Sequence, residues 1–172
     1  MSDTATTAPT EAFSGLPDSG RLWVFGVSRP LSDEEEGRLL AEVDAFLEGW
    51  AAHGAPLSAA RDWRYGRFLL VAVDNRVTPP SGCSIDALVH RLKGLEEALD
   101  VEIVGGAPVW LRDPDTGDVT RLSRPDFKAR AGRGEIPADT VVFDLSVTEI
   151  GELRLGRWEL PARESWHRRY LP

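Results

Sequence analysis

The sequence predicts an α+β protein, with a ferredoxin-like βαββαβ unit followed by a small C-terminal α+β extension. Three observations predict this fold class. Short apolar runs are typical of strands, two longer segments carry apolar residues at helical spacing, and the segments occur in the order βαββαβ. We expect residues 1–20 to form a disordered lead-in, residues 21–106 the ferredoxin-like unit, and residues 107–172 an extension packed on that unit.

The first strand and the first helix are predicted in neighbouring segments. Residues 21–27 (RLWVFGV) form a short apolar run. Ser32 and Glu35 then have the spacing of a capping box, in which each side chain bonds the backbone of the other residue at the start of a helix. Apolar side chains follow at helical spacing. We expect His53 in the last turn of this helix, because Gly54 is typical of a helix end.

The rest of the unit follows from the same two patterns. Two strands are predicted over residues 57–64 and 67–74, on either side of a hairpin turn at Tyr65-Gly66. A leucine stripe at helical spacing predicts a second helix over residues 84–99, and the run VEIV predicts a fourth strand over residues 101–104. In a ferredoxin-like unit these strands form an antiparallel sheet with both helices on one face.

The extension combines short strands with short helices. A turn at Pro114-Asp-Thr-Gly117 predicts a hairpin, because these residue types favour tight turns. The remaining predicted elements are a helix over residues 125–130, strands over 140–147 and 152–160, and a terminal helix that starts at Pro161.

Composition restricts the classes of function. The chain has 172 residues, 42% of them hydrophobic, and a formal net charge of −8, which argues against nonspecific binding to nucleic acid or to an acidic membrane. Its single cysteine fits a reducing compartment. The first twenty residues lack the basic start and apolar run of a signal peptide, and no apolar run approaches membrane-spanning length. These features predict a soluble, cytoplasmic protein.

Four stretches of the chain resemble an uncharacterised family of small bacterial proteins. They are FLEGWAAHGAPL, RFLLVAVD, PSGCSID and WELPARESWH, and PSGCSID is the most specific of them. Members of that family are often labelled "ABC transporter ATPase", and the resemblance implies no catalytic residues. A P-loop requires Gly-x-x-x-x-Gly-Lys-Ser/Thr to hold phosphates. Neither Lys93 nor Lys128 follows a glycine, so the sequence argues against ATPase function.

The start of the second helix is the candidate ligand site. We expect the first and third strands to be adjacent and parallel, which would place the loops after them side by side. Those loops would bring two arginines to the free backbone amides of the helix start, where anions bind. The predicted small-anion or carboxylate site contains Arg29, Arg76, Ser81, Gly82 and Cys83. In the alternative interpretation both arginines pair with nearby acids such as Asp74.

Cys83, Asp86 and His90 share one face of the same helix, because they are spaced by three and four residues. One interpretation makes this the solvated face, opposite the leucine stripe. In the other, the helix start activates the thiol and Asp86 orients His90. Two turns of helix separate Cys83 from His90 by about 10 Å, so a direct bond between them is not expected. His167 is therefore the predicted catalytic partner of Cys83.

Two further kinds of site are disfavoured. The chain lacks paired, closely spaced metal ligands, so we expect no metal and no cofactor. Several tryptophans stand beside arginines, a pattern that can bind single-stranded nucleic acid, but the net acidity makes that partner unexpected. Two function classes stay open. The first is a noncatalytic binding or interaction module for a small anion or a protein partner. The alternative is a thiol-dependent enzyme of acyl or other group transfer centred on Cys83.

Overall fold

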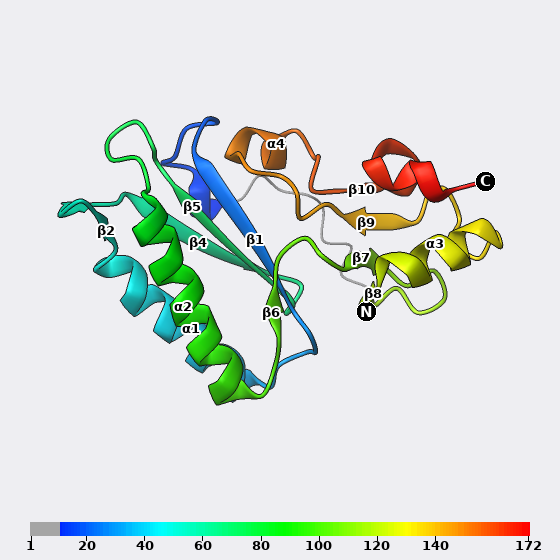
Figure 1. Cartoon of the computed structure of the whole chain (residues 1–172), viewed down its shortest axis with the longest axis horizontal. Coiled ribbons are helices and arrows are strands. Elements are labelled where there is room, and N and C mark those ends of the chain that lie inside the picture. Colours follow the sequence, from blue (N-terminus) through cyan, green and yellow to red (C-terminus); the bar gives the residue numbers. More distant parts are fainter. Residues whose placement is uncertain (1–10) are drawn as a thin grey trace.

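A four-stranded antiparallel sheet lies at the centre of the computed structural model, which describes residues 11–172 (Figure 1). Its strand order is β4-β5-β1-β6, and its strands are β1 (Arg21–Val27), β4 (Ala59–Arg64), β5 (Phe68–Val73) and β6 (Ile103–Val104). The Arg67 amide donates to the Arg64 carbonyl at 3.1 Å across the predicted hairpin turn, where Tyr65 and Gly66 both have positive φ. The protein is of the mixed α+β class.

The pairing of β1 with β5 is antiparallel, and the predicted parallel pairing is wrong. Arg21 lies opposite Val73, and Gly26 lies opposite Phe68. The physical reason is the chain path, because the chain crosses back through a helix into β4 and the tight β4–β5 turn then reverses its direction. The loops that follow β1 and β5 therefore lie at opposite ends of the sheet.

Two antiparallel helices, α1 (Asp33–Glu48) and α2 (Gly82–Leu99), cover one face of this sheet (Figure 1). The predicted capping box of α1 is confirmed, since the Glu35 amide donates to Ser32 Oγ at 3.2 Å and the Ser32 amide donates to Glu35 Oε2 at 2.9 Å. The leucine stripe of α2 is buried with apolar residues of α1 and the sheet, including Leu39, Val43, Val71, Leu88, Leu92 and Leu95.

His53 lies beyond the end of α1, not in its last turn as predicted. The helix stops at Glu48, and a short hairpin follows it, formed by β2 (Ala51–Ala52) and β3 (Ala55–Pro56). His53 and Gly54 are the turn of this hairpin, and both have positive φ. The helix ends early because Gly49 caps it, with its amide donating to carbonyls of the last turn.

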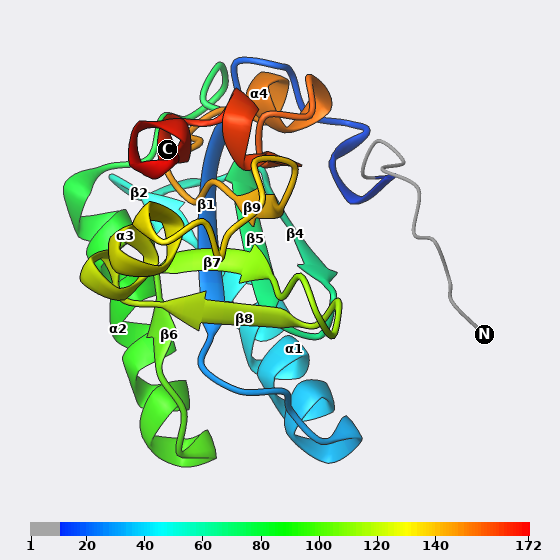
Figure 2. The ribbon, with the colours of Figure 1, turned by 90° about the vertical axis from the view of Figure 1, so that its right-hand side faces the viewer.

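A second four-stranded sheet covers the other face of the first one, and its strands cross those of β1 and β5 (Figure 2). Its order is β10-β9-β7-β8, from β7 (Val109–Arg112), β8 (Val119–Leu122), β9 (Val141–Phe143) and β10 (Glu159–Pro161). Trp110, Phe143 and Trp158 of this region bury their rings against Phe68 of β5. Aromatic packing thus joins the two sheets.

The helices of the C-terminal region differ in part from the prediction. The expected short helix is α3 (Arg124–Gly132), capped by Ser123. The expected strand over residues 152–160 is wrong, because that segment contains α4 (Ile150–Arg154) and only the short β10. The expected terminal helix is instead two 3₁₀ segments, Ala162–Glu164 and Trp166–Tyr170.

Residues 11–20 are ordered, contrary to the predicted lead-in. A 3₁₀ turn at Glu11–Phe13 buries Phe13 in the aromatic cluster between the sheets, where only 1% of its surface is exposed. That single aromatic anchor offsets the polar composition of the segment. The rest of the predicted lead-in, residues 1–10, lies outside the described residues. No helix within residues 11–172 has the length and apolar character needed to span a membrane.

Candidate functional site

The start of α2 is capped by side chains of the helix itself and of the residue before it. The Ser84 amide donates to Ser81 Oγ at 3.1 Å, and the Ser81 amide lies 2.8 Å from Ser84 Oγ. Ser81 is thus the helix cap, while Gly82 and Cys83 form the exposed first turn. This reciprocal capping engages the amides of Ser81 and Ser84, two of the backbone donors at the helix start.

The two arginines of the predicted anion site are far apart and both are paired. Arg76 donates to both carboxylate oxygens of Asp74, at 3.0 and 2.9 Å. Arg29 donates to Glu35 and also, at 2.8 Å, to the carbonyl of Leu99, the last residue of α2. Arg29 therefore lies at the opposite end of α2 from Gly82. The structure does not bring the five predicted residues together, because that arrangement depended on parallel strands.

The residues of the thiol hypothesis are also separated. Cys83, Asp86 and His90 share an exposed face of α2, and no bond joins them within the described part of the chain. His167 lies in the C-terminal 3₁₀ segment, on the other side of the central sheet (Figure 1). Its ring is buried between Phe127 and Trp166, with Nδ1 2.7 Å from Ser165 Oγ. Burial lowers the pKa of His167 to about 4, and nothing directs this ring toward Cys83.

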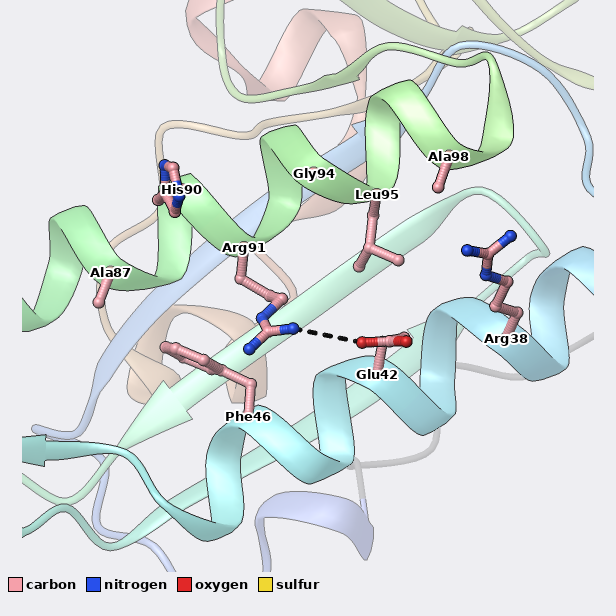
Figure 3. A pocket seen from close by; sticks show the side chains of 9 residues that line it. All are labelled: Arg38, Glu42, Phe46, Ala87, His90, Arg91, Gly94, Leu95 and Ala98. Atoms are coloured by element: carbon pink, nitrogen blue, oxygen red, sulfur yellow. Dashed lines mark hydrogen bonds and ion pairs between the residues drawn. The ribbon is translucent and has the colours of Figure 1, made fainter.

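A groove between α1 and α2, on the outer surface, is the better candidate (Figure 3). Its volume is about 570 Å³, within the range of sites for small molecules. Small residues of α2 keep it open, while Phe46 and Leu95 supply apolar surface and His90 lies at one edge. The lining residues are Arg38, Glu42, Phe46, Ala87, His90, Arg91, Gly94, Leu95 and Ala98.

Positively charged side chains outnumber negatively charged ones in this groove. Arg91 meets Glu42 at 3.3 Å, with both side chains about half exposed, and lies 6.0 Å from the centre of the Phe46 ring. Such an exposed, long ion pair is weak. Arg38 extends toward the space beside Ala98 and has no carboxylate partner among residues 11–172 (Figure 3). The groove thus combines two arginines and a histidine with one carboxylate.

Of these lining residues, only His90 was a predicted site residue. One signal for the rest was present in the sequence. Ala87, Gly94 and Ala98 are spaced by seven and four, so they share one face of α2 and leave space beside it. The matching face of α1 could be identified only once the helices were known to lie side by side.

Comparisons with known protein families, with curated proteins and with solved structures gave no match. No cluster of three or more histidine, cysteine or carboxylate side chains suited to a metal ion occurs within residues 11–172. The geometry and charge of the groove are therefore the observations that bear on its function.

Proposed function

We propose that this protein is a noncatalytic binding module that takes a small amphipathic anion in the groove between α1 and α2. The observation that carries the proposal is Arg38, a guanidinium without a carboxylate partner among the described residues, beside the apolar surface of Phe46 and Leu95. The proposal keeps the predicted class of ligand and moves its site from the start of α2 to the side of that helix.

Charge and size favour this ligand class. The chain carries a net charge of −8, whereas the groove has two arginines and a histidine against one carboxylate. Guanidinium groups form charge-assisted hydrogen bonds with carboxylate, sulfonate and phosphate oxygens. An apolar floor with a few placed polar groups is typical of small-molecule sites. A ligand with an apolar body and one anionic head would use both features.

We further infer a ferredoxin-like unit over residues 21–106 and a cytoplasmic location. The strand order β4-β5-β1-β6 and two helices on one face support the first inference. The single cysteine and the acidic composition support the second. The resemblance to the family with the PSGCSID motif is likewise a proposal, and it fits a protein without a P-loop.

A thiol-dependent enzyme has less support. Cys83 is exposed, with no hydrogen-bonded base among residues 11–172, and His167 is buried on the other side of the sheet. Nucleophilic catalysis requires a base within reach of the thiol. The geometry therefore favours binding over catalysis.

Titration with sodium octanoate, followed by amide NMR spectra of the full chain, tests the proposal. We expect saturable shifts confined to α1 and α2 around Arg38, Phe46 and Leu95. Arg38→Gln should weaken binding about tenfold, because it removes a charge-assisted bond. Ala98→Trp, which fills the groove from an exposed position, should abolish the shifts.

Arg133→Gln is the matched control, because Arg133 is an exposed arginine that pairs with Glu135 away from the groove. This variant should bind octanoate like the unmodified protein. Equal loss of binding in Arg38→Gln and Arg133→Gln would contradict the proposal, since it would reflect net charge alone. Shifts that leave α1 and α2 unaffected would also contradict it.

A further inference from the structure

A second groove lies at the seam between the two sheets and includes no residue of α1 or α2. Its volume is about 680 Å³, and it is bordered by the β4–β5 turn, the β7–β8 turn and the loop after β1. Tyr65, Arg67 and Arg112 line it, with Asp113 and Asp118 from the β7–β8 turn. Grooves between packed layers are common places for ligand sites.

Arg67 is the unusual residue of this groove. Its residue surface is only 8% exposed, yet no carboxylate among residues 11–172 pairs with it. It donates instead to the backbone carbonyls of Val27, Ser28 and Val119. Burial, and then the charge of nearby Arg121, lowers the pKa of Arg67 below its ordinary value. A buried charge without a counter-charge is costly, and a bound anion would offset that cost.

A guanidinium has five N–H donors, and the three carbonyls of Val27, Ser28 and Val119 account for three of those in Arg67. Two donors of Arg67 therefore have no partner among residues 11–172, and the side chain lines the groove. The carbonyl bonds also fix the guanidinium in place, so a ligand would meet donors that are already oriented.

Arg112 supplies a second oriented guanidinium. It donates to Glu159 Oε1 at 3.1 Å and lies 4.5 Å from the centre of the Tyr65 ring. Tyr65 in turn donates to Glu159 Oε2, from a backbone conformation with a φ of 57°. A two-residue hairpin turn requires positive φ at both of its central residues, so the β4–β5 turn sets the place of the Tyr65 ring beside Arg112. Glu159 and Tyr65 thus hold Arg112 at the groove.

The acidic residues of the groove limit the size of its ligand. Asp113 is already engaged, because the amides of Asp115 and Thr116 donate to its Oδ1 at 2.9 and 3.1 Å. Asp118 is exposed on the same turn. Asp113 and Asp118 line the groove together with the arginines, and their carboxylates would repel a large polyanion more strongly than a compact anion of low charge.

We propose that the seam groove binds a small oxyanion, a carboxylate or a phosphate, between Arg67 and Arg112. This site is independent of the groove between α1 and α2, because the two share no residue. The bound oxygens would accept from the N–H groups that Arg67 and Arg112 leave available.

Titrations of the full chain with sodium acetate and with inorganic phosphate, at constant ionic strength, test this proposal. We expect saturable NMR shifts at the side-chain Nε–H signals of Arg67 and Arg112 and at the amides of residues 116–120. Arg112→Gln should weaken binding about 10- to 100-fold, the usual consequence of losing a hydrogen bond to a charged group. Saturation by acetate alone would identify a carboxylate, and saturation by phosphate alone would identify a phosphate.

Two comparisons complete the test. Arg38→Gln changes the other groove and should leave oxyanion binding at the seam unchanged, so the two proposals can fail separately. Arg67→Lys keeps a charge but removes the planar fork, and we expect it to weaken binding wherever its spectrum is that of a folded protein. Shifts that grow linearly without saturation, or equal affinity in Arg112→Gln and the unmodified chain, would overturn the proposal.

Discussion

His167 illustrates how burial decides the behaviour of a single residue. Only 1% of its residue surface is exposed, and its ring contacts Phe127, Trp166 and Ser165. Burial penalises the charged imidazolium and lowers the pKa of His167 to about 4. A residue that the sequence analysis assigned to catalysis is therefore part of the C-terminal core.

This burial predicts a pH-dependent stability. In the folded protein His167 stays neutral down to about pH 4, whereas the unfolded chain takes up a proton near 6.5. The unfolded state then binds more protons between these values, so the free energy of unfolding falls as the pH drops from 6.5 toward 4. We expect this residue to contribute a loss of about 3 kcal/mol. Urea unfolding at several pH values measures it.

His167→Gln and His167→Phe supply the comparison. Both remove the ionisable ring, so both should lose the part of the pH dependence that belongs to this residue, whatever their stability at neutral pH. Carboxylates elsewhere titrate equally in all three proteins and cancel in the difference. Identical pH profiles for the two variants and the unmodified chain would contradict the assignment.

The sequence predicted the place of individual residues where local chemistry decides it. Ser32 and Glu35 cap α1 as expected, because a capping box involves only residues three apart. The bond from Arg29 to the Leu99 carbonyl and the partners of Arg67 could not be predicted, because these acceptors come from segments brought near only by the tertiary fold. His167 was misplaced for the same reason, since its burial depends on Phe127 from a different helix.

At the level of elements, Arg29 joins the start of α1 to the end of α2. Its guanidinium donates to both oxygens of Glu35, at 2.9 and 2.8 Å, and to the carbonyl of Leu99 at 2.8 Å. That carbonyl belongs to the last turn of α2, where backbone acceptors have no partner within the helix. The bond from Arg29, with the Ser32 amide, lowers the pKa of Glu35 to about 2.

Arg29→Ala should therefore loosen two helix ends at once. We expect faster hydrogen exchange in the first turn of α1 and the last turn of α2, with a lower free energy of unfolding. Glu35 stabilises the fold in its charged form, so its contribution is complete above pH 4.5 and is lost as the pH falls toward 2. Arg133→Ala removes an arginine that pairs with Glu135, and it should leave exchange at both helix ends unchanged. Equal exchange in the two variants would contradict this role.

Helices, strands and turns could be predicted from the sequence where a segment fits only one pattern. Both long helices follow from apolar spacing, and the β4–β5 turn from Tyr65-Gly66. The prediction of a strand over residues 152–160 was wrong because short apolar runs do not distinguish a strand from a single helical turn. In the structure Glu152 accepts from the amides of Thr148 and Glu149 at the start of α4. The predicted anion site was wrong because β5 was expected to be parallel to β1. Since β5 is antiparallel to β1, the loop after it lies at the other end of the sheet.

For the molecule as a whole, the packing of both sheet faces predicts one cooperative unit. The central sheet contributes Val71 to the cluster under α1 and α2, and Phe68 to the cluster under the second sheet. Neighbouring residues of β5 therefore belong to different layers of the core. Loss of either layer would expose apolar surface of the same strand, so we expect the layers to unfold together.

At Gly26 the central sheet lies directly against Trp110 of the second sheet, and this contact tests the cooperativity. A Cβ at Gly26 would clash with the ring of Trp110, which is fully buried. Gly26→Ala should therefore destabilise the protein by about 1–3 kcal/mol through overpacking. The loss of stability should affect α1 and α2 as well as the second sheet. Urea unfolding followed by tryptophan fluorescence and by far-UV circular dichroism should give one coincident transition, shifted to lower urea.

Two variants separate the clash from a general effect of alanine. Trp110→Leu removes the ring that the new methyl group would meet, so adding Gly26→Ala to it should cost less than in the unmodified chain, and a double-mutant cycle measures that difference. Gly37→Ala, in the exposed part of α1 with no atom near the new methyl group, should stabilise the protein by about 0.5–1 kcal/mol. If the two substitutions lowered the free energy of unfolding additively, the clash with Trp110 would not be the cause of the destabilisation. Separate transitions in Gly26→Ala would show that the sheets unfold independently.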